Sequence, residues 1–226
     1  MAYDRDVVVR CIKRHYELLV KAAYFDSTEI RYPPIEGWSD SQLAVDIMRA
    51  FGRSEDVIDL LRHLPYIKQL DGGSKDEIYF ETQHLSYLRD TWPFTSLTVE
   101  KCQGKQLFDK LLMPSAEDWP AAFITLTQDI YATWWIIDTA KGILHAVGTG
   151  YIEAPKDEPW LLGSVPHDIQ QYFDKIYYVI EGLTMVPCPK GKNSWNRTIQ
   201  PYTWEIGSVC FMSLSRFGDA LLMFAN

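Results

Sequence analysis

The residues best placed for acid–base chemistry are His145 and Asp138, which lie on either side of a predicted hairpin turn. His145 alternates with Ile143 and Val147, so these three side chains are predicted on one face of a strand. A histidine and a carboxylate beside one cavity could transfer protons in an isomerase, cyclase or lyase that needs no cofactor. The competing interpretation is a core histidine that bonds to a backbone carbonyl. The sequence leaves both interpretations open.

Aromatic side chains make up 14% of the chain and gather around the same predicted strands. The candidates for lining a small-molecule pocket are Tyr131, Trp134, Trp135, Trp160 and Tyr177. Apolar rings with polar tips suit small organic ligands. The same rings could instead fill the core and its rim, so a pocket is one of two interpretations here as well.

Neither a metal site nor a cofactor site has a recognisable motif in this chain. The five histidines have no HxxxH, HExxH or HxH spacing, and the four cysteines form no CxxC pair. Gly163-Ser164-Val165 lacks the second glycine of a GxSxG nucleophile turn, and no GK[ST] pattern follows Gly148-Thr149-Gly150. The sequence therefore predicts no metal and no cofactor.

The charge balance narrows the classes of partner. Lys and Arg number 22 against 30 Asp and Glu, which gives a net charge of −8 and a surface that repels phosphate backbones. Nucleic acid is therefore excluded as an expected partner, and a basic protein or a small organic molecule is favoured. The apolar stretch 206–224 carries Arg216 and Asp219, so no membrane span is predicted. Because charged residues begin at Asp4, we expect no export signal and a cytoplasmic location.

The elements that must position these residues begin with helices. Apolar residues recur at three- and four-residue steps over 3–25, which predicts an amphipathic helix. A second helix is predicted from 39 to about 51, because Ser39 and Gln42 have the spacing of a capping box. Acidic residues after Ser54 and an apolar stripe ending before Pro65 predict a third helix.

Strands are predicted in the rest of the chain. Short β-type runs at 78–80 and 97–99 indicate edge strands among loops, and stronger runs at 122–127, 133–138 and 143–147 predict an antiparallel meander. The uninterrupted apolar run 134–137 is typical of a central strand, and an amphipathic helix over 166–182 is predicted to cover it. We therefore expect one α+β domain over 1–226, with a helical layer at 1–65 and an antiparallel sheet with its covering helix at 66–226.

The second half of the chain resembles the SUKH superfamily. The resemblance covers about residues 121–187 and rests on the order of strands, the Asp138 turn, and the helix that begins Ser164-Val165-Pro166-His167-Asp168 and closes near Met185-Val186-Pro187. It implies an α+β domain with a central antiparallel sheet and flanking helices, used mainly as a noncatalytic binding module. Members include immunity proteins against nuclease toxins and a fungal cell-wall regulator. The stretch Leu60–Tyr66 is also similar to one in proteins of filamentous fungi.

Two functional hypotheses follow from these observations. The first is a noncatalytic intracellular binding module with an acidic surface. The alternative is a cofactor-free enzyme of fungal specialised metabolism, with His145 and Asp138 as proton-transfer groups and aromatic side chains as pocket walls. An enclosed cavity of roughly several hundred Å³, the size that organic ligands need, would favour the enzyme. A solid core would favour the binding module. The sequence does not indicate the oligomeric state.

Overall fold

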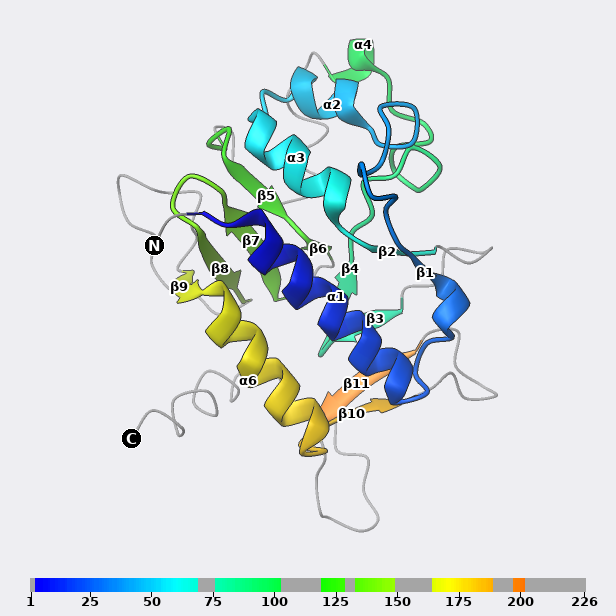
Figure 1. Ribbon diagram of the computed structural model, residues 1–226, viewed down its shortest axis with the longest axis vertical. Helices are drawn as coiled ribbons and strands as arrows, with labels where there is room; N and C mark the ends of the chain where they lie inside the picture. The colour runs from blue at the N-terminus through cyan, green and yellow to red at the C-terminus, as the bar shows by residue number, and fades with distance from the viewer. Residues whose placement is uncertain are drawn as a thin grey trace.

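The fold was analysed in a computed structural model (Figure 1). It describes residues 3–68, 76–102, 119–128, 133–148, 164–188 and 197–201. These residues form an α+β structure in which every sheet is antiparallel. The helical segments are α1 (Arg5–Lys21), the 3-10 helix η1 (Ser27–Glu29), α2 (Val45–Ala50), α3 (Glu55–His63), α4 (Val99–Cys102) and α6 (Ile169–Glu181).

The described strands form four sheets. The largest has the order β5-β7-β8-β9, from Phe123–Thr125, Trp134–Asp138, Ile143–Val147 and Val165–Asp168. The second has the order β3-β4-β6, from Glu77–Tyr79, Thr82–His84 and Thr127–Gln128. The two remaining pairs are β1 (Ile30–Arg31) with β2 (Tyr66–Ile67), and β10 (Met185–Cys188) with β11 (Thr198–Pro201).

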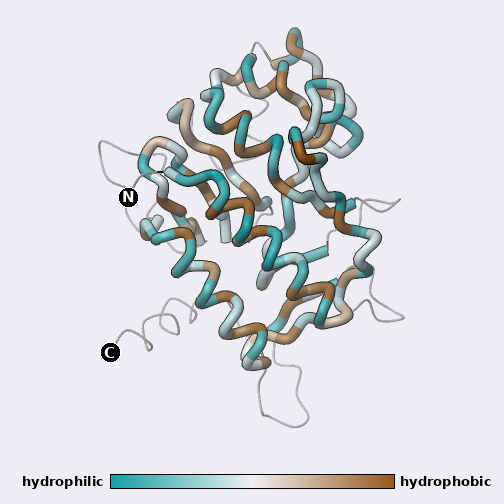
Figure 2. Tube along the Cα trace, viewed as in Figure 1, coloured by the Kyte–Doolittle hydropathy of each residue, from teal (hydrophilic) through white to brown (hydrophobic). Residues whose placement is uncertain are grey.

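Two helices lie side by side across one face of the four-stranded sheet. Figure 1 shows α1 and α6 in front of this sheet, with α2, α3 and α4 at one end of the molecule and β10 and β11 at the other. The Tyr177 hydroxyl donates to the Cys11 carbonyl at 2.6 Å, and Arg14 pairs with Asp174. Brown apolar and teal polar segments alternate along both helices in Figure 2. One apolar cluster therefore joins the helices to the sheet.

Several predicted elements are confirmed. The predicted helices at 3–25 and 54–64 are α1 and α3, and their first turns are capped by Asp4 and Ser54. The meander and its hairpin at 138–143 are β7 and β8, and β7 is a central strand that is buried along its whole length. The predicted covering helix is α6, and α1 lies beside it on the same face of the sheet.

The boundaries of two predicted helices are wrong for identifiable reasons. The helix predicted from 166 begins at Ile169, because Val165–Asp168 pairs with β8 and Asp168 caps the helix by accepting from the Gln171 amide. An edge strand tolerates Pro166 since its outward side needs no amide donor. The helix predicted from Ser39 begins at Val45, because Leu43 forms a bridge with Leu88 instead.

Two predicted strands also differ from the structure. The run 97–99 leads into the helix α4, in which the Cys102 amide donates to the Thr98 carbonyl at 3.2 Å. The run 122–127 is divided between two sheets at Leu126, so β5 joins the four-stranded sheet and β6 pairs with β4. Apolar and β-branched composition indicates burial at these positions, but it does not fix the partner strand.

Candidate functional site

The four-stranded sheet places the two predicted proton-transfer residues on the same face. In the β7–β8 register Asp138 lies opposite Ile143 and Ile136 lies opposite His145, so Asp138 and His145 are diagonal neighbours. Phe123 on β5 lies opposite Asp138, and its ring stacks on His145 with a centroid distance of 5.6 Å. Both candidate residues are buried. The predicted alternation of His145 with Ile143 and Val147 is present in β8, and the pairing with β7 adds Asp138 to the same face.

The contacts of Asp138 indicate a structural role. One carboxylate oxygen accepts from the amides of Ala140 and Lys141, at 2.9 and 3.1 Å, which closes the hairpin turn. Aspartate commonly stabilises turns in this way. The carboxylate therefore fixes the connection between β7 and β8.

His145 has a hydroxyl neighbour that could exchange a proton with it. Its Nδ1 atom lies 3.1 Å from the Ser164 hydroxyl oxygen, across the pairing of β8 with β9. A serine beside a histidine is the arrangement that activates nucleophiles, but it also satisfies a buried imidazole. The Phe123 ring stacks on His145, and only 2% of His145 is exposed. These contacts bury the imidazole ring against the sheet.

The aromatic residues predicted to line a pocket are separated by the sheet. Trp134 shares the His145 face, whereas Trp135 points to the opposite face and packs against α1 and α6. There the Trp135 ring nitrogen donates to the Tyr172 hydroxyl at 3.1 Å. Tyr177 is buried between the two helices. The proposed walls Trp135 and Tyr177 thus do not face the proposed acid–base pair; Tyr131 and Trp160 lie outside the described residues.

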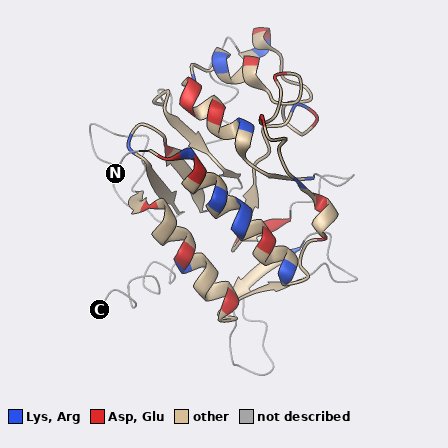
Figure 3. Cartoon of the chain, in the orientation of Figure 1, with Lys and Arg blue, Asp and Glu red and all other residues tan. Residues whose placement is uncertain are grey.

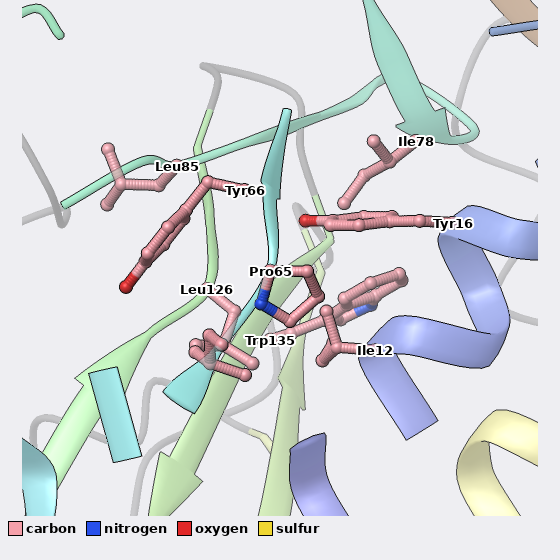
Figure 4. A pocket seen from close by; sticks show the side chains of 9 residues that line it. Ile12, Tyr16, Pro65, Tyr66, Ile78, Leu85, Leu126 and Trp135 are labelled. Carbon is pink, nitrogen blue, oxygen red and sulfur yellow. The ribbon is translucent and has the colours of Figure 1, made fainter. Parts of the chain in front are cut away.

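The core beneath α1 has very little empty space. A cavity there, shown in Figure 4, has a volume of about 10 Å³. Its lining is apolar and aromatic, and consists of Ile12, Tyr16, Leu64, Pro65, Tyr66, Ile78, Leu85, Leu126 and Trp135. Organic ligands occupy pockets of roughly 300–1,000 Å³, and about 10 Å³ is the space of a single water molecule. This part of the core therefore cannot hold a substrate.

Two further histidines are buried in the core. The His15 Nε2 atom lies 2.7 Å from the Ile78 carbonyl, and the His84 Nε2 atom lies 3.1 Å from the Ile67 carbonyl. A neutral ring that donates from Nε2 fits both contacts. Burial lowers the pKa of His15 and that of His84 to about 4 in each case, against the opposing effect of the carbonyl contact. Both side chains are therefore neutral structural donors at physiological pH.

Metal-binding clusters and membrane-spanning helices are both absent from the described residues. In them no group of three or more His, Cys, Asp and Glu side chains is arranged to bind a metal ion. None of the helices in these ranges has the length and apolar character needed to cross a bilayer. The apolar stretch at 206–224 lies outside the described residues.

In several surface ion pairs the carboxylate is more exposed than the arginine, whereas in Lys13–Glu17 and Arg14–Asp174 the two side chains are about equally exposed. In Arg31–Asp90 the arginine is 30% exposed and the aspartate 62%, and in Arg62–Asp40 the values are 23% and 64%. Carboxylates are likewise the more exposed partners in Arg5–Asp6, Arg49–Glu55 and Arg89–Asp46. Arginine stems pack on the protein while carboxylates reach solvent. Charges of both signs are interspersed in Figure 3, but in these pairs the outermost groups are acidic.

Two of these pairs are built around the buried Trp38. The Arg31 guanidinium lies 5.5 Å from the centroid of the Trp38 ring, and Arg62 donates to the Trp38 carbonyl at 2.9 Å. Their partners, Asp90 and Asp40, consequently flank one loop region. We call this the acidic loop face and define it as Ile35, Glu36, Asp40, Asp90 and Trp92, all of them exposed.

A tight turn, Pro34–Gly37, projects from the acidic loop face. The Gly37 amide donates to the Pro34 carbonyl at 2.9 Å, and the next amide, of Trp38, donates to the Arg62 carbonyl at 2.9 Å. Ile35 at the tip of the turn is 96% exposed. The sequence patterns described above assign no role to Pro33-Pro34 or Gly37. The proline pair beside Ile35 was the available signal for this exposed apolar residue.

Gly37 should be the least replaceable glycine of this region. Its φ is +82°, and an added Cβ would lie 3.0 Å from the Arg62 carbonyl oxygen. Gly52 is the matched control, because its φ is +71° but nothing lies within 4 Å of an added Cβ. Left-handed backbone costs a non-glycine residue roughly 1–2 kcal/mol. Gly37→Ala should therefore lower the free energy of unfolding by more than Gly52→Ala; equal losses in urea denaturation would contradict this packing.

Comparison with family models, curated proteins and solved structures gave no match to this chain. The SUKH resemblance therefore stays a prediction.

Proposed function

We propose that this protein is a noncatalytic binding module that engages a basic protein partner through the acidic loop face. The observation that carries the proposal is the exposure of the side chains in the two ion pairs around Trp38. In both pairs the carboxylate is more exposed than the guanidinium group. Complementary potentials favour the encounter of such a surface with Lys- and Arg-rich surfaces.

Within the described residues, the interior favours a binding role over small-molecule turnover. The predicted acid–base pair and two of its predicted aromatic walls lie on opposite faces of the sheet, and the cavity under α1 has a volume of about 10 Å³. Asp138 closes a turn, and His145 bonds to Ser164. These contacts leave the recognition surface as the feature of the described residues that best fits a function.

Affinity capture from a lysate of the source organism tests this proposal. The full chain is compared with the variant Glu36→Gln/Asp40→Asn/Asp90→Asn, and captured proteins are quantified by mass spectrometry. We expect the wild type to retain one or more basic proteins that the variant loses, because the variant removes three outward charges at a small cost in stability. Raising the salt concentration should release the same proteins.

A matched control separates this surface from general electrostatics. The variant Glu17→Gln/Asp174→Asn/Glu181→Gln removes the same number of charges from the exposed sides of α1 and α6. It should retain the partner at the wild-type level. If both triple variants lose the partner equally, or if the wild type retains only acidic proteins, the proposed function is wrong.

A further inference from the structure

We infer that the packing of α1 against β2, β3 and β4 opens in mild acid, because the two imidazole rings that close it have no room for a second proton. We call these contacts the histidine seam and define it as His15 of α1 with Ile78 of β3, and His84 of β4 with Ile67 of β2. The inference does not depend on the proposed binding function. It describes a pH-sensitive opening of one part of the fold while α6 stays in place.

Each ring of the histidine seam joins two elements of the fold. The His15 Nε2 atom lies 2.7 Å from the Ile78 carbonyl oxygen, 63 residues further along the chain, and the His84 Nε2 atom lies 3.1 Å from the Ile67 carbonyl oxygen. A carbonyl oxygen can only accept, so in both contacts Nε2 must carry the proton and donate it. His15 thereby attaches α1 to β3, and His84 attaches β4 to β2.

The second nitrogen of each ring cannot take a proton in the closed structure. In the part of the chain that the structure describes, the Nδ1 atoms of His15 and His84 are buried and have no hydrogen-bond partner. Protonation would turn each Nδ1 into a donor without an acceptor and would place a positive charge in the core. Both changes are costly in a poorly hydrated site. A charged ring is therefore stable only when the seam opens and water reaches Nδ1.

The side chains around the His15 ring do not compensate a positive charge. Four aromatic rings pack on it at centroid distances of 5.5 to 6.5 Å, those of Tyr16, Trp135, Phe173 and Tyr177. The two tyrosines are the titratable groups among them, and burial raises the pKa of both. They stay neutral at physiological and mildly acidic pH, so the ring lies in an uncharged aromatic environment.

The charged group that acts on His84 is Asp76, and it is already engaged by a cation. Asp76 favours the charged ring, but burial has the larger effect, and the pKa of His84 is about 4. The Arg197 guanidinium lies 3.2 Å from the Asp76 carboxylate and also pairs with Glu29. These ion pairs contain no histidine and hold the start of β3 to η1 and β11. Opening of the seam is therefore local rather than a complete release of β3.

A packing defect lies between the two histidine contacts. The cavity of about 10 Å³ beneath α1 is lined on one side by Tyr16 and Ile78, and on the other by Tyr66 and Leu85 (Figure 4). Tyr66 and Leu85 are the chain neighbours of the two residues in the second contact. Atoms that line a void lack contacts on one side, so less dispersion energy is lost when these surfaces separate. The seam is thus weakly packed where water must enter.

The direction of the pH effect follows from proton binding. A ring exposed to water has a pKa of about 6.5, whereas the pKa of both buried rings is about 4. As the pH falls below 6.5 the open form takes up protons that the closed form does not. Between about pH 7 and pH 5 each histidine should raise the ratio of open to closed molecules roughly 20-fold.

Hydrogen–deuterium exchange of the full-length chain tests the inference. Protection of the amides in β2, β3 and β4 is measured at about pH 7 and about pH 5, after correction for the intrinsic exchange rate, and is compared with that of α6. We expect protection in the three strands to fall roughly 20-fold or more. Protection in α6 should stay nearly constant, since the Tyr177 hydroxyl and Asp174 hold this helix to α1 without a histidine.

Non-titrating variants identify the groups responsible. His15→Gln/His84→Gln should have the same strand protection at both pH values, because glutamine donates but takes up no proton in this range. His63→Gln is the matched control, since His63 lies at the end of α3 with a side chain that is 22% exposed, and it should behave as the wild type does.

Each of three results would overturn the inference. An equal fall in α6 and in the strands would mean that the whole fold unfolds in acid, and unchanged protection in the strands would mean that the seam stays closed. Both results come from the wild type and do not require the variants to fold. A pH effect that persists in the double glutamine variant would assign the opening to other groups.

Discussion

Replacing Arg197 with methionine should lower the free energy of unfolding by about 3–5 kcal/mol, the usual cost of removing one partner from a buried ion pair. The Arg197 guanidinium bonds to both Glu29 oxygens, at 2.7 and 2.8 Å, and lies 3.2 Å from Asp76. The three side chains are only 15%, 14% and 7% exposed. The variant would leave two carboxylates in a poorly hydrated site without this cation.

This cluster joins segments that are far apart in the sequence. Besides the ion pairs, the Arg197 amide donates to Asp76 at 2.8 Å, and its guanidinium lies over the Phe25 ring at 4.9 Å. The cluster thereby attaches β11 to η1 and to the start of β3. Arg49→Met is the control, because Arg49 also makes a bidentate pair, with Glu55, but on the open surface. It should change stability little; a similar loss for the two variants in urea denaturation would contradict the importance of burial.

The second large effect is a loss of stability in mild acid. The pKa of His15 and that of His84 are about 4 in the folded protein, because burial disfavours the charged ring, whereas an unfolded histidine has a pKa of about 6.5. The unfolded chain therefore binds more protons as the pH falls from 6.5 towards 4, and stability is lost across this window. Above the histidine pKa of the unfolded chain the folded protein keeps its full stability. Between about pH 7 and pH 5 each histidine should lower the free energy of unfolding by roughly 2 kcal/mol.

Urea denaturation over this pH range measures the effect in the wild type and in His15→Gln, His84→Gln and the double variant. Glutamine keeps an amide donor for the Ile78 or Ile67 carbonyl but does not titrate in this range. Each single variant should remove about half of the dependence on pH, and the double variant most of it. A double variant with the same pH dependence as the wild type would show that other groups cause the loss.

Local sequence patterns predicted the elements whose contacts are mostly local. The helical periodicity of α1 and α3, their capping residues, and the β7–β8 hairpin with Asp138 at its turn all depend on neighbouring residues. The errors arise where pairing with a residue far away in the sequence determines where a helix begins. Leu43 bridges to Leu88 and delays α2, and Val165–Asp168 pairs with β8 and delays α6. Propensity gives way to tertiary pairing in such cases.

The same distinction applies to the candidate site. The β7–β8 pairing puts His145 and Asp138 on one face of the sheet and turns Trp135 to the other, which the expected pocket did not take into account. Closeness in sequence to one predicted meander does not tell which side chains the sheet separates. The acidic loop face was harder to predict, since it depends on Arg31 and Arg62 meeting around Trp38 from separate segments.

The salt dependence of partner binding tests the central claim most directly. The measurement is the dissociation constant of the basic protein that the wild type retains in affinity capture, determined by calorimetry with wild type and with Glu36→Gln/Asp40→Asn/Asp90→Asn at increasing salt concentrations. Binding through outward carboxylates predicts that the wild-type dissociation constant rises with salt, and that the variant binds more weakly with a smaller dependence on salt. A dissociation constant that changes neither with salt nor with these three substitutions would contradict recognition through the acidic loop face.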